Sequence, residues 1–295
     1  MIKVPPAPSQ PAPGQPAARR LRLTPARGTI LALGVPVAVA LIGGVAFSLV
    51  AAVGTASYPV KYAIPISDGR LTINFGGGDL TLQGTASSAA HLTGTVQYSL
   101  VRPYLSLTDR GGRGAVFTFT CGIPTGNCAL NGTADVPSGT AAAISTDGGD
   151  LTASDLTGGV SLSSGGGNLA ATNIAGNASL QTSGGDLTAV QLTGDVDLGT
   201  GGGNITATSI DSPRVTADSG GGDIEIVFTR VPQNVQVSAD GGDVTIVVPS
   251  GPTAYDVTAN PSGGNVNEAL PLATSSSHVI TAASGGGDIT IEQSP

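Results

Sequence analysis

Three consecutive segments of the chain repeat one another: residues 150–167 read DLTASDLTGGVSLSSGGG, residues 168–185 read NLAATNIAGNASLQTSGG, and residues 186–203 read DLTAVQLTGDVDLGTGGG. Each segment begins with Asp or Asn, continues with alternating apolar and polar residues, and ends in a glycine pair or triplet. A fixed period of this size is the signature of a stacked repeat architecture. The sequence therefore predicts that each segment builds one rung of a stack.

The glycine pair followed by Asp or Asn recurs outside these segments. From Asp150 to Asn204 it returns at the length of one segment, and after Asn204 the intervals grow slightly longer. We expect a turn at each site, because Gly takes positive φ without strain and Asp or Asn bonds the backbone of its own turn two residues on. The nine predicted turn residues are Asp79, Asp150, Asn168, Asp186, Asn204, Asp223, Asp243, Asn265 and Asp288.

The residues between the turns predict strands. Leu151 and Ala153 alternate with polar residues, and so do Val160 and Leu162 after a glycine bend. A period of two puts the apolar residues on one face of a strand. Two short strands per rung would enclose a thin core, which single rungs cannot bury alone. We therefore expect an all-β fold, a β-solenoid of the β-helix or β-roll kind. The alternatives, a β-sandwich or a propeller, usually have longer units that are richer in aromatic residues.

The N-terminal residues differ from the repeats in composition. Residues 1–27 are rich in Pro and Ala, are basic, and predict a disordered tail. Residues 28–53 carry no charge and are numerous enough for a tilted transmembrane helix. Four arginines precede this stretch, so the positive-inside rule predicts a cytoplasmic N-terminus and an extracellular C-terminal domain on a single-pass plasma-membrane protein. The alternative is a cleaved signal peptide, whose apolar core usually runs about 7–15 residues.

The remaining domain boundaries follow from the repeats. We expect a linker over 54–67 and the solenoid over 68–295, with an irregular N-terminal part over 80–147. That part holds both cysteines, Cys121 and Cys128, which we expect to form a disulfide outside the membrane. Metal binding is the alternative, but two cysteines without a nearby His do not complete a site. Its aromatic residues indicate a wide-stranded cap or a partner-binding patch: Tyr98, Tyr104, Phe117 and Phe119.

The charges and candidate catalytic groups argue against several functions. All of the acidic residues follow Ser57, where they outnumber the basic ones, so binding of nucleic acid is not expected. The turns partly match the calcium-binding nonapeptide GGxGxDxUx, but they carry neutral Asn as freely as Asp and occur once per repeat, not twice. A polysaccharide lyase or hydrolase would need paired carboxylates in a groove, whereas these acids are scattered at turns. We expect no enzyme, metal or cofactor.

An anchor followed by GGG[DN]-[LI]-x-[AT] rungs resembles a bacterial family of membrane-anchored β-strand-repeat envelope proteins, the putative adhesins. The resemblance runs from Leu71 to Ile291 and is clearest in GGDLTASDLTGGVSLSSGGGNL (148–169) and SGGGDIEIVF (219–228). It implies an outward-facing solenoid with a role in surface attachment or envelope-stress sensing, and it names no catalytic residue.

Two functions are consistent with these observations. The first is an adhesion, binding or envelope-structural module without catalysis, whose partner is an envelope glycan or protein. The alternative is an envelope-stress sensor or scaffold that signals through the cytoplasmic tail, where PPAP and QPAPGQP predict extended ligands for a partner groove.

Overall fold

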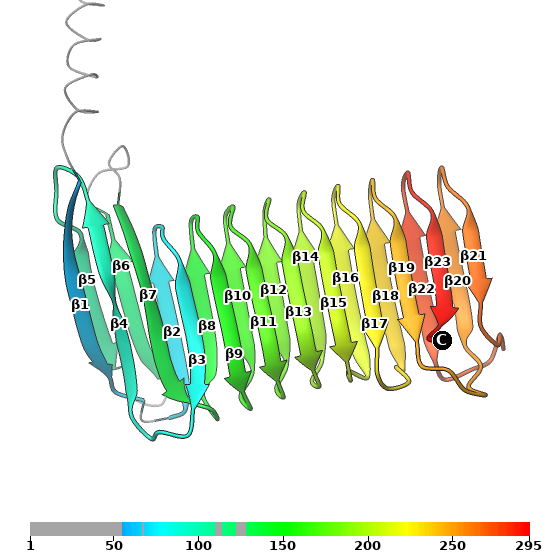
Figure 1. Cartoon of the computed structure of the whole chain (residues 1–295), viewed down its shortest axis with the longest axis horizontal. Helices are drawn as coiled ribbons and strands as arrows, with labels where there is room; N and C mark the ends of the chain where they lie inside the picture. Colours follow the sequence, from blue (N-terminus) through cyan, green and yellow to red (C-terminus); the bar gives the residue numbers. More distant parts are fainter. Residues whose placement is uncertain (1–54, 67, 110–113, 122–127) are drawn as a thin grey trace, which may run out of the picture. The chain divides into compact units, whose positions relative to one another are not determined.

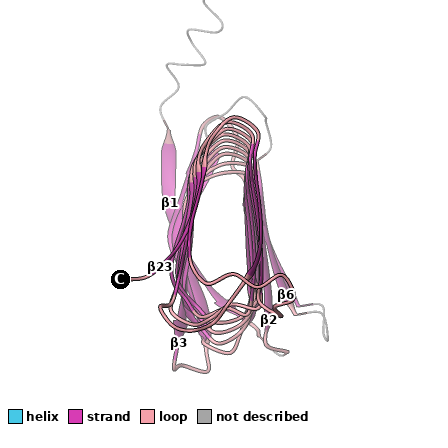
Figure 2. Cartoon of the chain, turned by 90° about the vertical axis from the view of Figure 1, so that its right-hand side faces the viewer, coloured by secondary structure: helices cyan, strands magenta, loops and turns pink. Residues whose placement is uncertain are grey.

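The computed structural model describes residues 55–66, 68–109, 114–121 and 128–295. These residues form two sheets that face each other, with turns along both edges (Figures 1 and 2). Over most of its length each sheet is parallel, and each rung gives one strand to each sheet. The described part of the chain is therefore an all-β, solenoid-like stack of repeated strands.

The predicted tail over 1–27 and the predicted transmembrane helix over 28–53 lie outside the described residues. Within the described residues, no helix has the length and apolar character that a membrane span requires.

Sheet A has 12 strands and sheet B has 11. In spatial order, sheet A consists of β1 (Ala56–Ile64), β4 (Ala90–Tyr98), β7 (Cys128–Pro137), β3 (Leu80–Thr85), β9 (Leu151–Leu156), β11 (Leu169–Ile174), β13 (Leu187–Leu192), β15 (Ile205–Ile210), β17 (Ile224–Phe228), β19 (Val244–Val248), β23 (Ile289–Gln293) and β21 (Val266–Ala269). Sheet B consists of β20 (Asp256–Pro261), β22 (Val279–Ser284), β18 (Asn234–Ala239), β16 (Arg214–Ser219), β14 (Val196–Thr200), β12 (Ala178–Thr182), β10 (Val160–Ser164), β8 (Ala141–Thr146), β2 (Arg70–Phe75), β6 (Ala115–Thr120) and β5 (Tyr104–Asp109).

The core repeats with the sequence. In sheet B, Leu162 pairs with Leu180, and Leu180 pairs with Leu198, so identical side chains stack along the solenoid. All three are fully buried. Parallel pairing in register places each apolar residue against its counterpart in the next rung. One sequence repeat therefore corresponds to one rung of the stack.

A left-handed residue turns the chain within four consecutive strands of sheet A, namely β9, β11, β13 and β15. Asp155, Asn173, Gln191 and Ser209 have φ between 56° and 58°. The buried positions around them are unevenly spaced, as between Ala153 and Leu156. Because the left-handed residue changes the strand's alternation, the last apolar residue also enters the core. Asn and Asp are the side chains that best tolerate this backbone region.

The repeated glycines are required by close stacking more than by backbone conformation. A Cβ on Gly167 would collide with the carbonyl of Gly149, and one on Gly185 would collide with the carbonyl of Gly167. Among the described glycine turns of the nine motifs, positive φ occurs at Gly78 and Gly149. The expectation that positive φ explains the glycine pairs is therefore wrong for most rungs.

The long interval between Asp79 and Asp150 does not interrupt the stack. β2 and β3 lie directly against β8 and β9, so Asp79 and Asp150 are neighbours. Strands β6 and β7 form the next rung outward, and β5, β4 and β1 continue it in antiparallel pairing. Within the part expected to be irregular, 80–147, strands β3 and β8 are thus regular rung strands.

Residues 54–67, expected as a linker, contain β1. This strand pairs antiparallel with β4 and buries Val60 and Ile64 in the core. The linker expectation is wrong for this stretch, because its apolar residues complete the end of sheet A. The periodic pattern does not reveal β4, the strand with which it pairs.

The C-terminal end shows a second change of order. The final strands β22 and β23 lie between the rung β18–β19 and the earlier pair β20–β21, as the red and orange strands of Figure 1 show. Tyr255 closes this end of the core and is fully buried, with main-chain bonds to Pro271 and Ala273.

Candidate binding surface

The predicted turn residues form one continuous ladder along an edge of the solenoid. The side-chain Oδ1 of Asp150 accepts a hydrogen bond from the backbone N–H of Asn168 at 2.7 Å, and Asn168 does the same for Asp186 at 2.9 Å. Each bond joins equivalent positions of adjacent rungs. The same bond links the rest of the series, in the stacking order Asn131, Asp79, Asp150, Asn168, Asp186, Asn204, Asp223, Asp243, Asp288 and Asn265.

These bonds differ from the expected ones. In place of a bond within its own turn, each Asp or Asn before the terminal Asn265 accepts the amide of the neighbouring rung. Asn131 belongs to the same ladder although no glycine pair precedes it, so the sequence motif does not identify it. An amide oxygen and a carboxylate oxygen can both accept this bond, which explains why either Asn or Asp can occupy the position.

A second, buried ladder lies beside the first. Ser164 Oγ donates to the carbonyl of Gly149 at 3.0 Å and accepts the amide of Gly167 at 2.9 Å. These bonds satisfy the backbone of two successive glycine turns, which would otherwise be buried without partners. The same arrangement recurs at Thr182, Thr200, Ser219 and Ser284. Both ladders have a structural role.

Within the described ranges, no three His, Cys, Asp or Glu side chains lie close enough together to hold a metal ion.

The outer face of sheet B carries a column of mostly polar residues, one from each rung. Its members pair in register in the order Thr118, Asn74, Ser145, Ser163, Gln181, Gly199, Asp218, Ser238, Ala283 and Asn260. Burial raises the pKa of Asp218, and the charges of Asp197 and Asp240 raise it further. The middle of the column is therefore a place where negative charge is already crowded.

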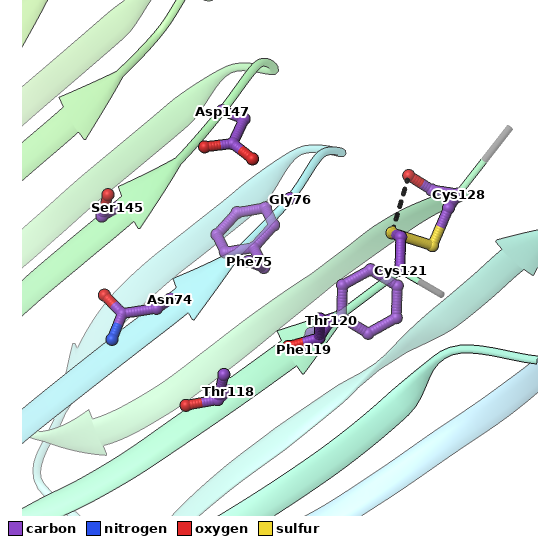
Figure 3. A pocket seen from close by; sticks show the side chains of 10 residues that line it. All are labelled: Asn74, Phe75, Gly76, Thr118, Phe119, Thr120, Cys121, Cys128, Ser145 and Asp147. Atoms are coloured by element: carbon purple, nitrogen blue, oxygen red, sulfur yellow. Dashed lines mark hydrogen bonds between the residues drawn. A yellow bond between two sulfur atoms is a disulfide. The ribbon is translucent and has the colours of Figure 1, made fainter. Parts of the chain in front are cut away.

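A groove of about 540 Å³ lies at the N-terminal end of this column. Asn74, Thr118 and Ser145 form its row of polar side chains, because they are paired positions on β2, β6 and β8. Figure 3 shows this row with the disulfide at the turn end of β6 and Asp147 at the turn end of β8. We call it the disulfide groove; it is lined by Asn74, Phe75, Gly76, Thr118, Phe119, Thr120, Cys121, Cys128, Ser145 and Asp147.

A disulfide joins Cys121 and Cys128, whose Cα atoms lie 6.1 Å apart. It links the end of β6 in sheet B to the start of β7 in sheet A, so it ties the two sheets together beside the groove. The aromatic residues of this region divide: Phe117 and Phe119 are buried, whereas Tyr104 is 71% exposed and Tyr98 is half-buried. The two phenylalanines thus build the core, and the two tyrosines contribute to the surface.

Three solved structures resemble the chain. They are a putative adhesin from Bacteroides fragilis (16% identity, 81% of this chain, 97% of that one, TM-score 0.49), a putative adhesin from Parabacteroides merdae (15%, 81%, 96%, 0.40) and a putative cell adhesion protein from Clostridium sporogenes (15%, 80%, 100%, 0.25). No curated protein matches the chain significantly. The family profile Toastrack DUF4097 matches residues 127–292, which is more than half of the chain. The chain therefore belongs to the Toastrack DUF4097 family.

Proposed function

We propose that this protein is a membrane-anchored, non-catalytic binding module that takes a hydroxyl-rich envelope glycan in the disulfide groove. The observation that carries the proposal is the row of Asn74, Thr118 and Ser145 across three adjacent strands. A concave site with a few convergent polar groups is the usual form of a small-ligand site.

The chemistry of the groove suits a neutral sugar. The Asn74 amide donates and accepts, and the hydroxyls of Thr118 and Ser145 do the same, so together they match the mixed donors and acceptors of sugar hydroxyls. Asp147 adds an acceptor at the rim. The disulfide offers apolar surface to the C–H face of a sugar ring, above the buried rings of Phe75 and Phe119. The Asp147 carboxylate also disfavours an anionic polymer in the groove.

Membrane anchoring by residues 28–53 is part of the proposal. The uncharged length of this segment and the arginines before it support a single-pass plasma-membrane protein with a cytoplasmic N-terminus. The solenoid would then face the outside, where envelope polysaccharides are accessible. The sequence resemblance implies surface attachment or envelope-stress sensing, and the first of these agrees with the proposal.

The proposal is tested by measuring how purified envelope polysaccharides and peptidoglycan sacculi bind to three proteins: the wild type, the Asn74→Ala variant and the Asn260→Ala variant. We expect Asn74→Ala to weaken binding about tenfold, because a lost hydrogen bond costs on the order of 1.4 kcal/mol. Asn260 is the matched control, since it is an exposed Asn in the same column at the opposite end. Binding of none of these polymers, or equal weakening by both variants, would contradict the assignment.

A further inference from the structure

Exposed apolar side chains gather at the N-terminal end of the solenoid. In the described part of the chain, the exposed large hydrophobic residues are Leu100 (49%), Val101 (45%), Tyr104 (71%), Val266 and Leu272. Three of these five lie within five consecutive positions. An apolar cluster on the surface of a protein commonly marks an interaction site.

A preformed aromatic and cationic group adjoins this cluster. The rings of Tyr58 and Tyr98 meet edge to face, with centroids 5.9 Å apart. The guanidinium of Arg102 lies 5.3 Å from the Tyr58 centroid, and its Nε donates to the Tyr98 hydroxyl at 3.1 Å. These contacts hold the three side chains at the surface beside Leu100 and Val101. We call the whole surface the aromatic edge: Tyr58, Tyr98, Leu100, Val101, Arg102 and Tyr104.

The aromatic edge lies where the described chain begins. Strands β1 and β4 lie side by side (Figure 1), and Ala56, the first residue of β1, pairs with Tyr98, the last residue of β4. Tyr104 begins β5 and pairs with Thr120 at the end of β6. Only Gly54 and Thr55 separate Ala56 from the uncharged stretch that ends at Val53. This short connection spans at most about 10 Å when fully extended, so covalent geometry keeps the edge close to the end of that stretch.

We propose that the aromatic edge rests in the interfacial layer of the membrane that holds residues 28–53. The inference rests on the membrane anchor of the proposed function. Tyrosine is enriched at the headgroup level, where its ring and hydroxyl meet different environments. Leu100 and Val101 would enter the acyl boundary, and Arg102 would place its charge among the headgroups.

The contact would be confined to the N-terminal end of the solenoid. Farther along the same edge, the glycine turns carry the acids of the ladder, beginning with Asp79 and Asp150, which gain nothing from a lipid surface. Thr120 lines the disulfide groove and pairs with Tyr104 of the aromatic edge, so the groove would open close to the lipid. Its ligand would then be a membrane-proximal polymer.

A single-tryptophan experiment on the full chain tests this placement, because the chain has no Trp of its own. The full chain carrying Tyr104→Trp is reconstituted into phosphatidylcholine vesicles, with or without phosphatidylcholine whose acyl chains are dibrominated. The chain carrying Leu272→Trp, at the far end of the solenoid, is the control. We expect the Tyr104→Trp variant to lose roughly half of its emission to the brominated lipid and to be blue-shifted, as for an interfacial residue. We expect the Leu272→Trp variant to be unchanged. Adding Leu100→Asp and Val101→Asp to Tyr104→Trp should remove most of the quenching.

The experiment distinguishes failure of the membrane anchor from failure of the lipid contact. Flotation with the vesicles after an alkaline wash reports the anchor independently of the quenching. If the chain floats but the two tryptophan variants respond alike, the aromatic edge does not contact lipid and the anchor stands. A blue-shifted Tyr104→Trp variant that bromine does not quench means that protein covers the edge, and this also overturns the proposal. Loss of flotation overturns both the anchor and the lipid contact.

Discussion

Leu162→Asp is expected to unfold the middle of the solenoid. Leu162 is fully buried and lies in register between Ile144 and Leu180. A carboxylate there has no partner in the core between the two sheets. The substitution should therefore lower the free energy of unfolding by more than about 4 kcal/mol. Because rungs stabilise their neighbours, the loss should spread along the stack. Denaturant unfolding of residues 55–295, followed by circular dichroism, measures it.

Ser163→Asp is the control for this change. Ser163 is the next residue of β10, and its side chain is exposed on the outer face of sheet B. The same substitution there should change the unfolding free energy by no more than about 0.5 kcal/mol. Similar midpoints for the two variants would mean that β10 does not present Leu162 to the core.

Gly185→Ala is expected to cost about 2–4 kcal/mol, a large effect for one methyl group. The new Cβ would collide with the carbonyl of Gly167 in the adjacent rung, and a backbone atom cannot move aside as a flexible side chain can. Relief of the clash would require the two rungs to separate and would weaken the ladder bond between Asn168 and Asp186. The midpoint of thermal or denaturant unfolding gives the size of the effect.

The preceding residue provides a matched control. Gly184 has no atom within 4 Å of an added Cβ, and its φ lies outside the left-handed region. Gly184→Ala should therefore be close to neutral. If Gly184→Ala and Gly185→Ala were equally destabilising, the glycine pairs would be required by turn conformation and not by rung stacking.

The sequence predicted the stacked strands correctly because the signal is local. The constant repeat length and the alternation of Leu151 with Ala153 and of Val160 with Leu162 are enough to assign two strands to a rung. The buried ladder could have been predicted in the same way, since Ser164, Thr182 and Thr200 occupy equivalent positions of successive repeats. It escapes the sequence analysis because Ser and Thr at a turn usually indicate solvent exposure.

The other features depend on contacts between distant residues. Asp79 and Asp150 are adjacent in the stack although they lie far apart in the sequence. The number of residues between them therefore predicts neither the hydrogen bond that joins them nor the outer rung formed by β6 and β7. The disulfide groove is similar, because Asn74 and Thr118 belong to strands that pair only after the insert has folded back. The insertion of β22 and β23 ahead of β20 and β21 likewise has no periodic signal.

The most direct test of the account compares two deletions in residues 55–295. Removing residues 163–180 takes out one complete repeat and joins Leu162 to Gln181, so Leu162 replaces Leu180 and the alternation continues. Removing residues 163–179 takes out one residue fewer and joins Leu162 to Leu180, which reverses the two faces of the strand. By circular dichroism and thermal melting, we expect a strand-rich, cooperatively melting protein for the first deletion and loss of cooperative melting for the second. Equal stability of the two would contradict the claim that one sequence repeat builds one rung.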